Sequence, residues 1–323
     1  MSFLLYCLAG CQVRRPRGRR VLPLVLLALM GCPPVAVAAP ATLLPTDPAL
    51  LMASCRQARA AGSVDQLRRL RQRLLQDPPS NQPFAQLLLT SEALLDCQAP
   101  AASLQVLDGY GPLPGAERRQ WLVQQWRAAS AGLDHARAAQ ALLRLSALEG
   151  VDLETFSLPV GPVPAGGRPR QRPALDLLAE DLESLGRSAQ AAALLLAARS
   201  PGELRAHRLR RGVMLSPRME LAERDRWLET ALEEAAAAGA WSLASELLDD
   251  QVLLHLQAGE DPSRAVQRRL RLSQRLDDAY GEWRLRRHDP LERSRAAALE
   301  KQLRSPSAPG GHAVFPAPRS PLP

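Results

Sequence analysis

The stretch Gly239-Ala-Trp-Ser-Leu-Ala244, with its neighbours from about 221 to 256, decides how this chain folds. Apolar residues repeat at helical spacing on both sides of it, namely Leu228, Ala231, Leu232 and Ala235 before, and Trp241, Ala244, Leu248, Val252 and Leu256 after. Gly239 can adopt the left-handed conformation that ends one helix, and the small Ala244 lets the next helix pack closely. We therefore expect two antiparallel helices here.

The composition favours helices along the rest of the chain. The 323 residues suffice for one or two domains, and they include only 5 Trp, 3 Tyr and 4 Phe. Leu and Ala dominate the apolar residues and both favour helices, whereas β-branched residues are sparse. A substantial sheet is not expected.

The formal net charge of +8 is concentrated in two places. Five arginines lie within residues 14–20, ahead of an apolar run. Residues 264–304 hold 11 Arg and 1 Lys against 6 acidic residues. Because the basic character is local, it does not indicate a nucleic-acid-binding protein.

Residues 1–39 have the three parts of a secretion signal. The Arg-rich residues 14–20 are followed by an apolar run over 21–31 and by small residues through Ala39. That run is shorter than the roughly 20 apolar residues that span a bilayer. We expect an exported protein, periplasmic or otherwise extracytoplasmic, with an uncleaved membrane anchor as the alternative.

Two cleavage patterns compete within this signal. Ala36-Val37-Ala38 fits ordinary signal peptidase, whereas Leu29-Met30-Gly31-Cys32 resembles a bacterial lipobox that would leave a lipidated Cys32. A similar pattern ends at Cys11, but nothing basic precedes it. We therefore interpret residues 1–12 as lying upstream of the true start.

The two remaining cysteines, Cys55 and Cys97, fall in two predicted helices, 42 residues apart. In an oxidising compartment they could form a disulfide. Alternatively, each is a small buried apolar residue of its helix. The sequence leaves both alternatives open.

Periodicity divides the rest of the chain into four segments. Residues 40–157 and 174–304 predict helix hairpins, and Asp261-Pro262 predicts the start of a last long helix running past Trp283. Between the two regions, residues 158–173 contain five Pro and three Gly, which predicts a linker or long loop. Residues 305–323, rich in Pro, Ser and Gly, predict a disordered tail.

A helix, a Gly, a second helix with a small residue five positions later and a Pro-containing turn recur along the chain. The matching residues are Gly186, Ala191, Ala198 and Pro201, then Gly239, Trp241 and Ala244, and also Gly62 with Pro79. This order is similar to the 34-residue tetratricopeptide repeat. However, Gly132, Gly186 and Gly239 are spaced by 54 and 53 residues, and the family's first-helix aromatic residues are mostly missing.

The resemblance implies an all-α fold in which antiparallel helix hairpins stack as an α-solenoid over about residues 48–285. It also implies a surface that binds proteins or peptides without catalysis. A generic array of helix hairpins is the alternative.

No pattern indicates an enzyme, a cofactor or a metal site. The five His are dispersed, and neither a phosphate-binding Gly loop nor a nucleophile elbow occurs. The adjacent pairs Asp249-Asp250 and Asp277-Asp278 would point about 100° apart on a helix, which is typical of solvated charge.

The most unusual local pattern is an aromatic pair beside arginines: Tyr280, Trp283, Arg284, Arg286 and Arg287. Such residues are enriched where proteins bind one another, so we consider them a candidate partner-binding site. Alternatively, the aromatic residues close the last core layer and the arginines are solvated near a helix C-terminus.

We therefore expect a non-catalytic exported scaffold that binds an unidentified protein or peptide. The alternative is a peripheral binder of anionic membranes or polymers through the Arg-rich C-terminal helices, including Arg264, Arg268, Arg271 and Arg275. An enzyme whose site has no linear motif is a third hypothesis.

Overall fold

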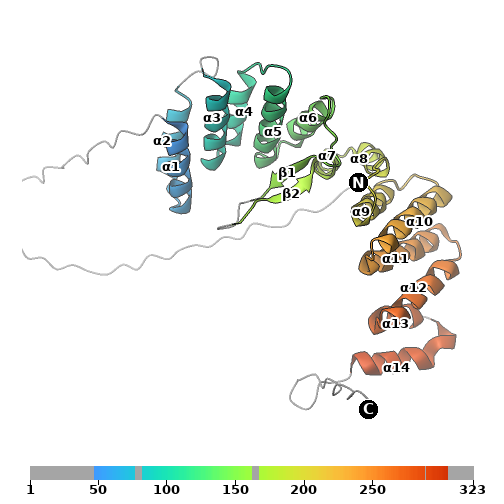
Figure 1. The fold of residues 1–323 in the computed structure, drawn as a ribbon. Helices are drawn as coiled ribbons and strands as arrows, with labels where there is room; N and C mark the ends of the chain where they lie inside the picture. The colour runs from blue at the N-terminus through green and yellow to red at the C-terminus, as the bar shows by residue number, and fades with distance from the viewer. Residues whose placement is uncertain (1–46, 77–81, 162–166, 288, 305–323) are drawn as a thin grey trace, which may run out of the picture. The chain divides into compact units, whose positions relative to one another are not determined.

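The computed structural model describes residues 47–76, 82–161, 167–287 and 289–304 (Figure 1). Within these ranges the chain forms fourteen α-helices, one 3-10 helix and one two-stranded hairpin. The fold is therefore predominantly helical, and adjacent helices pack against one another. The predicted secretion signal, Cys32 and the predicted tail 305–323 lie outside the described residues.

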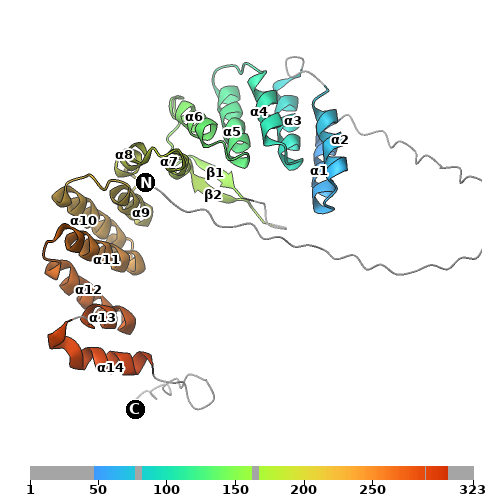
Figure 2. The ribbon, with the colours of Figure 1, turned by 180° about the vertical axis from the view of Figure 1, so that it is seen from behind.

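The first eight helices form four consecutive pairs. They are α1 (Pro48–Ala60) with α2 (Val64–Leu74), α3 (Phe84–Asp96) with α4 (Pro100–Asp108), α5 (Ala116–Ala131) with α6 (His135–Ser146), and α7 (Ala174–Ser184) with α8 (Ser188–Leu196). Each pair also packs against the next one along the chain, and α3 contacts both α1 and α5 directly. The view from behind shows the same order (Figure 2).

The remaining helices follow the same pattern of sequential packing. They are α9 (Glu203–Met214), α10 (Leu221–Ala237), α11 (Trp241–Ala258), α12 (Ser263–Arg275), α13 (Ala279–Arg286), the 3-10 helix η2 (Pro290–Glu292) and α14 (Arg293–Leu303). The hairpin predicted around Gly239 is present as α10 and α11, which pack against each other. Gly239 has a φ of 70° and therefore adopts the predicted left-handed conformation.

Left-handed turns recur along the chain and are not confined to glycine. Residues with positive φ lie between paired helices at Gly62, Gln98, Leu133, Gly186, Gly239 and Asp277. The fifth residue after each of them is buried, namely Leu67, Ser103, Ala138, Ala191, Ala244 and Glu282. A search for Gly alone finds only three of these turns.

Residues 158–173 differ from the predicted linker. Strands β1 (Ser157–Val160) and β2 (Arg170–Pro173) pair antiparallel, with Val160 opposite Arg170. The hairpin continues directly into α7, and the backbone N–H of Ala174 donates to the carbonyl of Phe156 over 2.8 Å. Prolines suggested a loop, but proline is tolerated in a two-stranded sheet where its missing N–H faces an open edge.

The hairpin also does not divide the core. One apolar cluster extends from Leu51 in α1 to Leu195 in α8 and includes Leu158 of β1. A second cluster extends from Ala206 in α9 to Leu254 in α11. The break between apolar clusters therefore falls between α8 and α9, after the predicted boundary at 158–173.

The predicted last long helix is two helices, α12 and α13. Asp277 has a φ of 56°, and the carboxylate of Asp278 accepts a hydrogen bond from the backbone N–H of Gly281 over 2.8 Å. Aspartate tolerates the left-handed conformation and caps helix N-termini, so this pair ends one helix and begins another. The expectation that both acids are solvated helix charge is wrong for Asp278, which also pairs with Arg269 at 2.9 Å.

A buried ionic cluster lies beside the break between the two apolar clusters. The side chain of Arg208 in α9 is 2% exposed and donates to Asp176 over 2.7 Å and to Glu154 over 3.3 Å. The Glu154 carboxylate also accepts from the backbone N–H groups of Arg199 and Ser200. Burial raises the pKa of Glu154, but these hydrogen bonds outweigh it and leave the pKa below its ordinary value.

Candidate functional site

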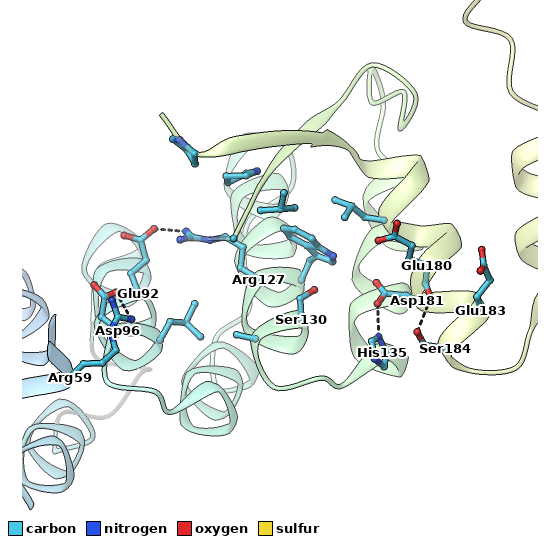
Figure 3. Close-up of a pocket in the computed structure, with 18 of the residues that line it drawn as sticks. Arg59, Glu92, Asp96, Arg127, Ser130, His135, Glu180, Asp181, Glu183 and Ser184 are labelled. Atoms are coloured by element: carbon cyan, nitrogen blue, oxygen red, sulfur yellow. Dashed lines mark hydrogen bonds and ion pairs between the residues drawn. The ribbon is translucent and has the colours of Figure 1, made fainter. Parts of the chain in front are cut away.

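A groove with a volume of about 1350 Å³ is lined by the first helices of four successive pairs, α1, α3, α5 and α7 (Figure 3). The hairpin of β1 and β2 contributes to the same groove through Pro159, Val160, Gly161 and Pro169. The guanidinium of Arg172 in β2 donates a hydrogen bond to the carboxylate of Glu180 in α7 over 2.8 Å, which holds the hairpin against α7. The helices and the hairpin thus form one site.

The groove combines apolar side chains with charged side chains of both signs. The larger apolar side chains that line it are Met52, Leu95, Trp126, Val160 and Leu177. Charged side chains that form ion pairs with one another also line the groove. An apolar surface with a few convergent polar groups is the usual composition of a binding site.

At one end of the groove, ion pairs connect α1, α3 and α5. Arg56 lies 2.7 Å and Arg59 3.9 Å from the carboxylate of Asp96. Arg127 lies 2.7 Å from Glu92 (Figure 3). Arg56 and Arg59 share one carboxylate, and each is about half exposed. This end therefore carries three guanidinium groups against two carboxylates.

A disulfide also joins α1 to the end of α3. Cys55 in α1 and Cys97 after α3 are bonded, with their Cα atoms 4.8 Å apart, and both are fully buried. The ion pair of Arg56 with Asp96 involves the residues next to these cysteines, so a covalent and an ionic link hold α1 against α3. The guanidinium of Arg71 also donates to the carbonyl of Cys97 over 2.7 Å.

At the other end of the groove, three acidic residues of α7 lie together. Glu180 pairs with Arg172 and Arg211, and Glu183 pairs with Arg211 at 2.7 Å. Burial raises the pKa of Glu180, but the hydrogen bonds and charges of Arg172 and Arg211 outweigh it and hold the pKa below its usual value. The third acid, Asp181, has a different environment.

Asp181 is 7% exposed, and its Oδ1 lies 2.9 Å from Nδ1 of His135 (Figure 3). Burial raises the pKa of Asp181, and the hydrogen bond and charge of His135 oppose this only in part. Oδ2 of Asp181 has no hydrogen-bond partner among the described residues, and neither has Nε1 of Trp126, a residue that is 4% exposed. Asp181 Oδ2 and Trp126 Nε1 are therefore an acceptor and a donor without a partner on residues that line the groove. Oε1 of Glu183 also lacks a hydrogen bond, but it is ion-paired with Arg211 at 2.7 Å.

Sequence reasoning missed this groove because its residues come from seven separate elements, namely six helices (α1, α3, α5, α6, α7 and α9) and the β-hairpin. The only local signals were the Cys55 and Cys97 positions and the Pro-rich stretch, and neither indicates a binding site. The sequence pointed instead to α13.

The structure places the predicted aromatic pair together on α13. The rings of Tyr280 and Trp283 are 5.8 Å apart, and the guanidinium of Arg287 lies 4.9 Å from the Trp283 ring. Tyr280 is 59% exposed, so it does not close a core layer. Arg284 forms an ion pair with Asp249. Arg286 forms ion pairs with both Glu282 and Glu292, each at 2.8 Å.

The predicted basic face of α12 is partly neutralised. Arg268 lies 2.5 Å and Arg264 3.8 Å from the carboxylate of Glu229, whereas Arg271 and Arg275 are exposed. Asp249 and Asp250 are also paired: Asp250 lies 2.5 Å from Arg210 in α9, and Asp249 pairs with arginines of α12 and α13. These two acids connect neighbouring helices and are not merely solvated.

In the described ranges, no group of three or more His, Cys, Asp or Glu side chains could hold a metal ion, and no helix there has the length and apolarity needed to cross a membrane. No model of a known protein family and no curated protein sequence matches the chain. The function is therefore inferred from the geometry of the groove.

Proposed function

We propose that this chain is a non-catalytic scaffold that holds an extended polypeptide segment of a partner protein in the groove. The observation that carries this proposal is the groove itself, lined by four successive first helices and one β-hairpin. It offers apolar surface for side chains and ionic groups of both signs at its two ends. Such a surface suits a polypeptide, which carries both kinds of group.

The size of the groove supports a polypeptide over a compact small molecule. Packed helices lie about 8–10 Å apart, and α1 packs against α3 and α3 against α5, so the path across these three helices alone is roughly 18 Å long. An extended chain advances about 3.3 Å per residue, so this part accommodates about five residues, and α7 and the hairpin extend the groove beyond it. The groove volume of about 1350 Å³ also exceeds the roughly 300–1,000 Å³ of common small-molecule pockets.

We further propose that the helix pairs are degenerate tetratricopeptide-like repeats stacked as an α-solenoid. The left-handed residues Gly62, Gln98 and Leu133 are 36 and 35 residues apart, close to the 34-residue period of that family. The longer intervals to Gly186 and Gly239 contain the β-hairpin and the additional helix α9. The resemblance to this family implies protein binding.

The proposed location is an extracytoplasmic, oxidising compartment. The predicted secretion signal motivates it, with Cys32 as the candidate lipidation site. The disulfide of Cys55 and Cys97 supports it, because structural disulfides persist mainly in oxidising compartments. The partner would be another exported protein.

The proposal is tested by selecting displayed random nonapeptides on the full chain and measuring their affinity by fluorescence anisotropy. Ala131 lines the groove and is exposed, so Ala131→Trp should obstruct it and weaken binding at least tenfold. The matched control, Ala136→Trp, changes an exposed residue of α6 that does not line the groove, and should bind like the wild type.

Two results would contradict the groove proposal. If Ala131→Trp binds the selected peptides normally while the double variant Tyr280→Ala, Trp283→Ala does not, the partner binds at α13. If no peptide is selected and the chain instead binds anionic vesicles in a salt-sensitive manner, the Arg-rich face of α12 is the functional surface.

A further inference from the structure

We propose that the groove selects a segment carrying a basic residue, whose ammonium or guanidinium group docks against Asp181. This inference rests on the proposed function and specifies its ligand. Three observations support it: the unsatisfied carboxylate oxygen, the charge of the surrounding end of the groove, and the unsatisfied indole N–H of Trp126.

The first observation is the state of the Asp181 carboxylate. Oδ1 is bonded to His135, while Oδ2 is buried without a donor among the described residues. Leaving a buried acceptor unsatisfied is unfavourable, and it is more unfavourable when the acceptor is charged. The neighbouring guanidinium groups, Arg172 and Arg211, are bonded to Glu180 and Glu183 and do not supply that donor. A ligand that brings a donor would remove the penalty.

The second observation is the charge at this end of the groove. Three carboxylates, on Glu180, Asp181 and Glu183, face two guanidinium groups, which leaves one negative charge when His135 is neutral. The opposite end has three arginines against two carboxylates. A basic residue therefore docks at the α7 end, where the field is favourable, and is disfavoured at the α1 end.

The third observation identifies the ligand as a polypeptide. Nε1 of Trp126 is a buried donor without a partner in the described structure, and it lines the same groove as Asp181. A backbone carbonyl of the bound segment would accept this hydrogen bond. A free polyamine could supply the cation for Asp181, but it has no acceptor for the indole N–H.

The test uses nonapeptides whose binding to the full chain is abolished by Ala131→Trp. We expect these peptides to be enriched in Lys or Arg at one position. Asp181→Asn keeps the size of the side chain and an acceptor for His135, and should weaken binding about 30-fold, as expected when one partner of a buried ionic contact is removed. Changing the peptide's basic residue to Gln should produce the same loss in the wild type and no further loss in Asp181→Asn.

Further variants separate binding of the basic residue by Asp181 from a purely structural role of Asp181. Asp65→Asn removes an exposed charge of α2 outside the groove and should bind normally. Trp126→Phe keeps an aromatic ring without the donor and should weaken binding about threefold to tenfold. Without peptide, Asp181→Asn should melt at a higher temperature than the wild type at pH 7, because it removes a buried carboxylate whose Oδ2 lacks a donor. A purely structural residue would give the opposite change.

Three results would overturn the inference while leaving the groove proposal intact: groove-dependent peptides without a preferred basic residue, unchanged affinity in Asp181→Asn, or full loss on peptide substitution in both proteins. Displacement of the peptide by micromolar spermidine would assign the Asp181 subsite to a free polyamine. Failure to obtain any groove-dependent peptide would instead contradict the proposed function itself.

Discussion

The first eight helices and the last three are held together by different interactions. Helices α1 to α8 share one apolar cluster and a disulfide. In α12 to α14, the buried apolar side chains are small in number, Ala265, Ala296 and Leu299, whereas Arg269, Ser273 and Glu282 are buried polar residues. The Glu282 carboxylate forms ion pairs with two arginines, Arg286 at 2.8 Å and Arg295 at 2.9 Å.

This difference has consequences for stability. An apolar cluster tolerates many substitutions of similar volume, whereas a buried ionic cluster stabilises only when every charge has its partner. Ionic interactions also weaken with salt and with protonation of the carboxylates. The last three helices should therefore respond to solvent conditions under which α1 to α8 remain folded.

The comparison also bears on the two candidate binding sites. The groove lies mainly on the region with the apolar core and the disulfide, so a ligand of the proposed kind should meet a rigid surface and lose less entropy on binding. The aromatic residues Tyr280 and Trp283 lie on the region held by ion pairs. The affinity of a partner bound at Tyr280 and Trp283 would therefore depend on the salt concentration.

The largest effect should come from the buried ionic cluster of Arg208, Asp176 and Glu154. Arg208→Ala leaves Asp176 and Glu154 without their guanidinium partner, which should lower the free energy of unfolding by about 3–5 kcal/mol. Urea unfolding followed by circular dichroism measures this change. The exposed control Arg187→Ala should change it by less than about 0.5 kcal/mol; equal effects would contradict the importance of burial.

Removing the disulfide should have the next largest effect. The bond closes a separation of 42 residues, and its removal in Cys55→Ala, Cys97→Ala should lower stability by about 3–4 kcal/mol through the entropy of the unfolded chain. Hydrogen exchange should show the loss in α1 to α4. A reductant should alter the electrophoretic mobility of the wild type and not that of the double variant. If the wild type migrates equally with and without reductant, the disulfide is excluded.

Acid should change the contributions of Glu282 and Asp181 to stability with opposite signs. Hydrogen bonds from Arg295 and Arg286 hold the pKa of Glu282 below 4.5, so its stabilisation is present above pH 4.5 and is lost as the pH falls through the folded-state pKa. Burial raises the pKa of Asp181 above 3.8, so its contribution is present below pH 3.8 and is lost as the pH rises through the folded-state pKa.

Matched variants test this contrast. At pH 7, Glu282→Gln should destabilise the protein by about 2 kcal/mol, less than a fully buried pair because Arg295 is half exposed, whereas Asp181→Asn should stabilise it. Both differences from the wild type should shrink at pH 3.5. A destabilising Asp181→Asn at pH 7 would contradict the assignment of its unsatisfied carboxylate.

The smallest effect concerns the left-handed turns. Leu133 has a φ of 56° and is 75% exposed, so Leu133→Gly should stabilise the protein by about 0.5–1 kcal/mol, since glycine has no penalty in that conformation. Gly239→Ala should destabilise it by about 1 kcal/mol for the same reason. Melting temperatures measured side by side would show shifts of opposite direction; shifts of the same direction would contradict this account.

The fold was largely predictable because helices follow from local periodicity. The pairing of α10 with α11 and the left-handed Gly239 were expected from the sequence, and the structure has both. The turns at Gln98, Leu133 and Asp277 were not expected, because non-glycine residues adopt positive φ only when the surrounding packing compensates for the strain. The β-hairpin was missed because its prolines resemble a loop in a one-dimensional pattern.

The sequence by itself determined the helical character of the chain, the places where glycine ends a helix, and the concentration of arginine in residues 264–304. Only the tertiary structure decided that Met52, Trp126 and Leu177 line one groove and that Oδ2 of Asp181 lies there without a donor. Periodicity is a property of neighbouring residues along one helix. A binding groove depends on which side chains of separate helices meet, and that is decided by packing.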